Sequence, residues 1–315
     1  MKKLLQLLVC GGLLAAAVVR AAETAAAPLV PADALWHIQA DFERLKETQL
    51  GQKILTELEQ TPLVRVFEGL KVALNFDPRQ DLAQAAVFGW EPGEDKVVIV
   101  AKGKFDAARL QELVTANPEY AAEKHGEHLI HGWRDARRAG RGVPNARTFG
   151  AVHGQDTVVV APQAALVRSA LEVLNKPALS RQGRKAAEPA AGGPILAASA
   201  GKITLPNLPP PVQAVLQDVK GLEAELNENP GGKVRLTLRV TAAQEDTAKA
   251  YRDILQGVRG VLTVLKERPV LNQLAAGWET GQQGAQASVT VEMPAEEVIP
   301  LVRRAIQQQR RGIER

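Results

Sequence analysis

The residues of this chain best suited to chemistry lie in one short stretch, HGEHLIHG, at positions 125–132. It holds three of the five histidines of the chain and a glutamate, and imidazole and carboxylate groups bind zinc. Flanking glycines favour a β-strand over a helix, and on a strand His125, Glu127 and His131 share one face. On one strand His125 and His131 would lie about 20 Å apart, too far to share an ion. These three residues are therefore candidate metal ligands that need further ligands from elsewhere, and the alternative is an exposed polar edge or turn.

A cluster of arginines follows the histidines and is a candidate anion-binding site. Its members are Arg134, Arg137, Arg138, Arg141 and, further along, Arg147. Such a cluster could bind an anionic polymer, a lipid head group or an acidic partner. The alternative is a solvated loop, which we favour because the chain without its expected signal peptide, this cluster included, carries almost no net charge.

Other catalytic chemistry has little support in the sequence. The four serines, Ser169, Ser180, Ser199 and Ser288, lie outside any GxSxG motif. The GGK at 231–233 lacks the rest of a P-loop and precedes a strand, so we expect a hairpin turn there. The carboxylates of Asp77 and Asp81 are interpreted as a turn signal and a helix cap. No cofactor motif is present, so no cofactor is expected.

The first residues have the pattern of a secretory signal peptide. Lys2 and Lys3 precede an apolar run to Val19, which is shorter than a membrane span needs, and residues 1–21 form the expected signal. Cys10, the only cysteine, would leave with it, and Val9 before it argues against lipidation. Without residues 1–21 the chain has 39 − 3 = 36 basic residues against 35 acidic ones. Nucleic acid is therefore not expected as a partner, and we expect an exported, periplasmic or extracellular protein.

The elements expected around these residues alternate between short strands and amphipathic helices. In Lys233–Val240 every second residue is apolar, which is typical of a strand with one buried face. Asp41 and Asp106 precede helical patterns and are expected to cap them. The pattern predicts an α+β fold of two similar halves, each a mainly antiparallel sheet with helices packed on one face. We place an N-terminal α+β domain at 28–178, a linker at 179–194 and a C-terminal α+β domain at 195–315.

Three segments of the first half resemble a group of uncharacterised exported bacterial proteins. They are FDPRQDLAQAAVFGWEPGEDKVVIVAKGKFDAARLQEL at 76–113, HLIHGWRD at 128–135 and DTVVVAPQAALVRSALEVL at 156–174. The pattern that they share with this group is a DPxxDL segment, a GxFD helix start and a valine-rich strand that leads into a helix. The resemblance implies an exported α+β protein, and it transfers no catalytic residue.

These observations predict a non-catalytic binding or structural role in the cell envelope. The expected partner is an envelope protein or polymer of unknown identity, and no membrane-spanning segment is expected after signal cleavage. The alternative is a metal-dependent hydrolase that uses the His125–His131 cluster with ligands from elsewhere in the fold.

Overall fold

The structure is a computed structural model, and it describes residues 29–61, 63–117, 119–143, 146–180, 194–201, 218–264 and 269–300. The expected signal peptide, most of the expected linker and the last fifteen residues lie outside these ranges. The division into two domains, with its boundaries, stays a prediction.

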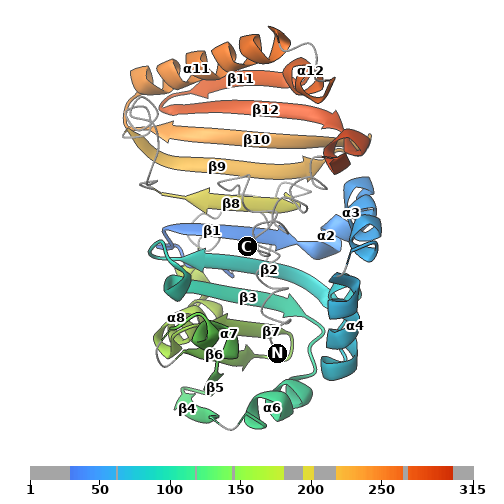
Figure 1. Ribbon diagram of the computed structural model, residues 1–315. Coiled ribbons are helices and arrows are strands. Elements are labelled where there is room, and N and C mark those ends of the chain that lie inside the picture. Colours follow the sequence, from blue (N-terminus) through green and yellow to red (C-terminus); the bar gives the residue numbers. More distant parts are fainter. Residues whose placement is uncertain are drawn as a thin grey trace.

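The strands form one antiparallel sheet that runs through both halves of the chain (Figure 1). The strands are β1 (Trp36–Asp41), β2 (Leu82–Gly89), β3 (Val97–Gly103), β4 (Ala121–His125), β5 (His128–Arg134), β6 (Arg147–His153), β7 (Thr157–Ala161), β8 (Leu196–Ala200), β9 (Val219–Glu228), β10 (Lys233–Ala242), β11 (Trp278–Gln283) and β12 (Gln286–Pro294). Their order across the sheet is β11-β12-β10-β9-β8-β1-β2-β3-β7-β6-β5-β4. The α+β class and the antiparallel pairing are confirmed. The two halves, however, share this sheet, because β1 of the first half pairs with β8.

The helices lie on both faces and around the margins of the sheet. They are α2 (Phe42–Glu47), α3 (Gln49–Glu59), α4 (Leu63–Leu74), α5 (Pro78–Asp81), α6 (Ala107–Thr115), α7 (Ala136–Gly140), α8 (Ala164–Asn175), α11 (Glu245–Val264) and α12 (Pro269–Ala276), with 3-10 turns η2 (Glu94–Lys96) and η3 (Pro177–Leu179). The expected caps are confirmed: the carboxylate of Asp41 accepts from the Arg44 amide at 2.9 Å, and that of Asp106 from the Arg109 amide at 2.9 Å.

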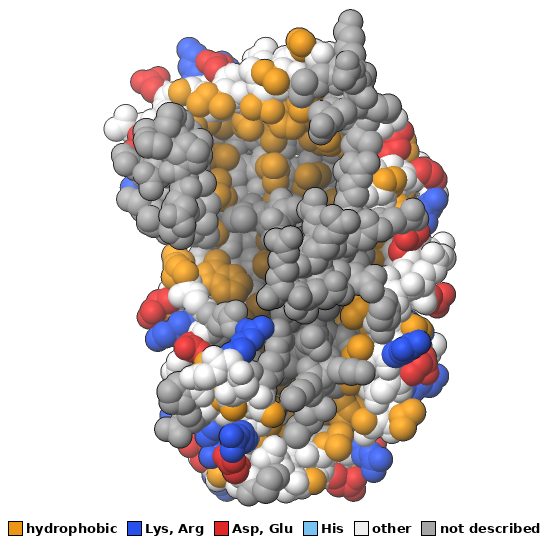
Figure 2. All heavy atoms as spheres, viewed as in Figure 1, with side chains coloured by type: hydrophobic (Ala, Val, Ile, Leu, Met, Phe, Trp, Pro, Cys, Tyr) orange, Lys and Arg blue, Asp and Glu red, His pale blue; other side chains and the backbone are white. Residues whose placement is uncertain are grey.

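One face of the sheet is apolar along most of its width, and we call it the Ile38 face. Because antiparallel partners point to the same side, the register identifies a single row of side chains across the strands. From β12 to β7 this row is Val289, Leu238, Ala224, Ala198, Ile38, Val87, Ile99 and Val160. Figure 2 shows hydrophobic side chains gathered below α11.

The opposite face, which we call the His37 face, changes character along the sheet. Across β2, β3 and β7 it presents Phe88, Val98 and Val159, which pack against Val167 and Leu171 of α8. The same face of β8, β9, β10 and β12 is polar. Its residues there include Ser199, Glu223, Glu225, Arg239 and Ser288.

The helices cover an apolar face of the sheet in each half. Helix α8 covers the His37 face in the first half, whereas α11 packs on the Ile38 face in the second, where Tyr251 and Leu255 contact residues such as Val240 and Val289. Helices α8 and α11 therefore pack on opposite faces of the shared sheet, and α3 of the first half joins the Ile38 face, where Leu50 and Ile54 contact Val234 of β10.

The core under α8 can be tested at Phe88, which is completely buried and meets Trp90 edge-on at a centroid distance of 5.6 Å. Phe88→Ala is expected to lower the free energy of unfolding by about 3–5 kcal/mol, because it leaves a cavity in a packed core. Urea denaturation measures the change. Val72→Ala on α4 is the matched control, since Val72 is exposed, and it should change stability by less than about 0.5 kcal/mol. Equal effects of the two substitutions would contradict the placement of this core.

Candidate functional site

The stretch HGEHLIHG forms a β-hairpin, so the single strand expected from the sequence is wrong. Strand β4 ends at His125, Gly126 and Glu127 form the turn, and β5 begins at His128. Gly126 has φ +59°, a left-handed conformation that glycine adopts without the penalty of a side chain. Gly126, one of the glycines that favoured a strand over a helix, is thus the residue that reverses the chain.

The hairpin does not bring the three expected metal ligands together. His125 is the cross-strand partner of His128, and Glu127 lies in the turn between them. His131 is three residues beyond His128 on β5, so its side chain points to the opposite face. There its Nδ1 lies 2.9 Å from the hydroxyl of Tyr120. A site made of His125, Glu127 and His131 has no support in this arrangement.

Instead the register brings His125 into a row with two other imidazoles, those of His128 and His153, on the His37 face. His128 pairs with His125 on β4, and its ring lies against that of His153 at the end of β6, with centroids 5.2 Å apart and a 42° tilt. The amide nitrogen of Asn175, the last residue of α8, lies 3.3 Å from Nε2 of His128. Sequence analysis did not identify His153, because it is 25 residues from His128 and only the pairing of β5 with β6 makes them neighbours.

Burial favours the neutral form of two histidines in this region, His153 and His131. Burial lowers the pKa of His153, the neighbouring His128 lowers it further, and Asp156 acts in the opposite direction. Burial also lowers the pKa of His131 on the other face. Within the described ranges, no group of three or more His, Cys, Asp or Glu side chains stands in position to hold a metal ion.

Two of the four candidate anion-binding arginines already have acidic partners. Arg134 Nη1 lies 2.6 Å from Glu119, and Arg138 forms an ion pair with Asp95 and donates to the Arg147 carbonyl at 3.0 Å. These contacts join the ends of β5 and β6 to the chain around them. The anion-binding site at Arg134, Arg137, Arg138 and Arg141 stays a prediction.

Helix α11 carries an exposed apolar stripe that sequence analysis did not single out. Ile254, Val258, Val261 and Val264 are 49%, 41%, 62% and 77% exposed. The spacing of the first three, i, i+4 and i+7, places them on one side of the helix. The buried residues of α11 lie on the adjacent side of the helix and pack on the sheet. The apolar surface of the helix is therefore wider than the part that the sheet covers. A row of exposed apolar side chains is a candidate interaction surface.

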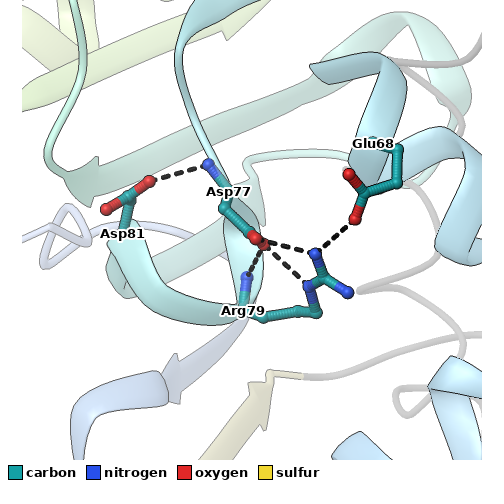
Figure 3. A network of polar contacts seen from close by, with 4 residues as sticks. All are labelled: Glu68, Asp77, Arg79 and Asp81. Carbon is teal, nitrogen blue, oxygen red and sulfur yellow. Dashed lines mark hydrogen bonds and ion pairs between the residues drawn. The ribbon is translucent and has the colours of Figure 1, made fainter. Parts of the chain in front are cut away.

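The DPRQD segment forms the polar network of Figure 3. Asp77, expected as a turn signal, is the N-cap of α5 and accepts from the Arg79 amide at 3.1 Å. Asp81, expected as the cap, is instead the last residue of α5, and its carboxylate accepts from the Asp77 amide at 2.7 Å. The Arg79 guanidinium lies 2.7 Å from both Asp77 and Glu68 and so ties α5 to α4. Hydrogen bonds from Arg79 hold the pKa of Asp77 below its ordinary value, although burial raises it. This network is structural.

No family model matches the chain, and no curated protein matches it. Among solved structures, crystal form IV of TP0453 is similar over 92% of this chain and 99% of that chain, with 10% sequence identity and a TM-score of 0.47. Crystal form III of TP0453 is similar over 88% of this chain and 96% of that chain, with 8% identity and a TM-score of 0.45.

None of the described helices is both long and apolar enough to span a membrane.

The Asp77–Arg79 pair predicts a pH-dependent contribution to stability. Because the pKa of Asp77 is lowered on folding, the pair stabilises the fold above the ordinary carboxyl pKa of ~3.9, and this is lost as the pH falls through the lowered value. Asp77→Asn keeps a capping side chain but removes the charge, and it should cost roughly 1–2 kcal/mol at neutral pH.

Urea denaturation from pH 7 to pH 2 measures this contribution, and the difference from the wild type should disappear at the acid end. Asp253→Asn is the control, because Asp253 is an exposed partner of the adjacent Arg252. A cost for Asp77→Asn that does not change with pH would show that charge has no part in it.

Proposed function

We propose that this chain is an exported, non-catalytic protein of the cell envelope that binds a partner protein through α11. The signal-peptide pattern supports export. The observation that carries the binding proposal is the exposed stripe of Ile254, Val258, Val261 and Val264, which we call the α11 stripe. The α11 stripe lies at one end of the sheet, where the helix crosses β11 and β12 and leaves its outer side open (Figure 1).

The chemistry of the α11 stripe suits another apolar helix or groove. Burial of an exposed valine or isoleucine side chain contributes about 1.5–3 kcal/mol, so a partner that covers three of them gains an appreciable binding free energy. Apolar residues at i, i+4 and i+7 are the anchors of helix-in-groove recognition. Each is β-branched, and such side chains lose little rotamer freedom on binding because their χ1 angles are already restricted.

Two glycines within α11 support close approach by a partner. Gly257 and Gly260 lie in the helix interior, where glycine costs about 1 kcal/mol relative to alanine. A Cβ atom added at either position would meet nothing within 4 Å. Packing among the described residues therefore does not require either glycine. The backbone of a partner helix could approach closely at Gly257, which lies between Ile254 and Val261 along the helix.

The charges of α11 favour a protein partner over an anionic membrane surface. Membrane-surface helices usually carry lysines and arginines on their polar face. In α11, Arg252 is paired with Asp253 at 2.6 Å, and Arg259 donates to the Ala275 carbonyl at 3.2 Å. Three acidic residues, Glu245, Asp246 and Asp253, balance its three basic ones, so the helix has no excess of positive charge.

The alternative function, a metal-dependent hydrolase, gains no support from the fold. It would use His125, Glu127 or His131 with ligands from elsewhere in the fold, and within the described ranges no group of three or more His, Cys, Asp or Glu side chains stands in position to hold a metal ion. Ser169, one of the serines considered above, donates to the Ala165 carbonyl within α8. We therefore propose binding without turnover.

Substitution of Gly257 by alanine distinguishes an effect on stability from an effect on partner binding. Gly257→Ala should raise the free energy of unfolding by up to about 1 kcal/mol, because alanine favours the helix and the added methyl group meets no neighbour. It should also weaken partner binding, since the methyl group holds the partner away. Gly69→Ala in α4 is the matched control: it also has open space at the Cβ position, and it should raise stability without changing binding. Unchanged binding by the Gly257 variant would argue against a close helix–helix contact.

The partner can be identified by photo-crosslinking in intact cells. A photoreactive amino acid at Val261 should form an adduct with one envelope protein, whereas the same group at Val72, exposed on α4, should not. Val258→Asp should abolish the adduct, because it places a charge in the apolar contact. Mass spectrometry identifies the adduct. Equal adducts from both positions would refute the α11 stripe as the binding surface, and an adduct with a second copy of this chain would replace the partner by self-association.

A further inference from the structure

Three of the five histidines of the chain lie side by side at the other end of the sheet from α11. His125, His128 and His153 stand at the ends of β4, β5 and β6, and we call them the histidine row. Pairing of β4 with β5 and of β5 with β6 sets all three side chains on the His37 face. All three strand ends lie at hairpins, because Gly126 turns the chain between β4 and β5 and Gly154 turns it between β6 and β7, with φ +59° and +61°.

The contact between His128 and His153 has the spacing of two imidazoles on one ion. Metal–nitrogen bonds of ~2.0–2.1 Å in a tetrahedral site place the centres of two imidazole rings about 5 Å apart. The observed centroid distance is 5.2 Å. In addition, Nδ1 of His153 is buried and has no hydrogen-bond partner among the described residues. A bound cation would satisfy this nitrogen, which is otherwise an unpaired buried polar atom.

The surroundings of the histidine row are compatible with a cation. Arg168 of α8 is paired at 2.6 Å with Glu123, which is two residues before His125 on the same face. Asp156 follows His153 in the next turn and adds a negative charge. The side-chain amide of Asn175 contacts Nε2 of His128. With its oxygen turned toward this nitrogen, the amide would accept from Nε2–H and leave Nδ1 of His128 for the ion, as outer partners of metal-bound histidines commonly do.

We propose that His128 and His153, with His125 as a third ligand, bind a divalent transition-metal ion, and that zinc is its expected occupant. Imidazole nitrogen is a ligand that suits zinc, copper and nickel. The three side chains do not yet stand as a complete ligand set. Binding therefore includes a change of rotamer at His125, which is partly exposed at the hairpin end. Such a metal would clamp the β4–β5 hairpin to β6 and so stabilise the last strands of the sheet.

The test is a zinc titration of the full mature chain without an affinity tag, followed by calorimetry and native mass spectrometry. The expected result is one zinc ion per chain. His128→Ala and His153→Ala should each weaken binding by more than tenfold, and His125→Ala by about tenfold. His131→Ala is the matched control: it lies on the same strand but faces the other side and contacts Tyr120, and it should leave zinc binding unchanged.

A second measurement on the wild-type protein does not depend on the folding of variants. Copper(II) serves as the probe, and its electron paramagnetic resonance spectrum should show hyperfine coupling to two or three nitrogen ligands. No zinc bound at about 100 μM metal, or equal weakening by His131→Ala, would overturn the proposal. A copper spectrum with oxygen ligands alone would do the same. None of these three outcomes would affect the proposal for the α11 stripe, which lies at the opposite end of the sheet.

Discussion

Antiparallel pairing between β1 and β8 is the interaction on which the rest of this structure depends. The register from Trp36↔Ala200 to Ala40↔Leu196 aligns the strands of the first half with those of the second. It also makes the side-chain rows of both halves continuous, because cross-strand partners point to the same side. A shift of one residue would exchange the faces of one half and place His37 and Gln39 on the apolar face. The pairing therefore decides which surfaces each half presents.

The shared sheet explains why the two halves bury opposite faces. In the first half, α8 covers the His37 face, and the apolar side chains of β2, β3 and β7 supply its core. In the second half, that face carries charge: Arg239 lies 2.5 Å from Glu225 and 3.4 Å from Glu223. These charges satisfy one another on a partly buried surface, where an unpaired charge would be costly. The apolar residues of the second half face the other way, and α3 and α11 cover part of them.

This arrangement leaves two features at opposite ends of one rigid sheet. At the β11 end, α11 uses one side to pack on the sheet and leaves the α11 stripe to solvent. At the β4 end, two hairpins bring the histidine row together. The strand order separates the two features by almost the full width of the sheet. A protein with a binding helix at one end and a metal-clamped edge at the other would present its partner surface from a stable support.

The sequence by itself determined the local features of this protein. The alternation in Lys233–Val240 predicted a strand with one apolar side, Asp41 and Asp106 predicted helix caps, and GGK at 231–233 predicted a hairpin turn, because each depends on residues within a few positions. Only the tertiary structure decided which distant residues meet. His153 joins His128 through the β5–β6 register, the halves join through β1 and β8, and Val261 is exposed because the sheet covers a different side of α11. Strand pairing and helix packing depend on contacts across tens of residues, and a periodic pattern shows that a face is apolar but not what covers it.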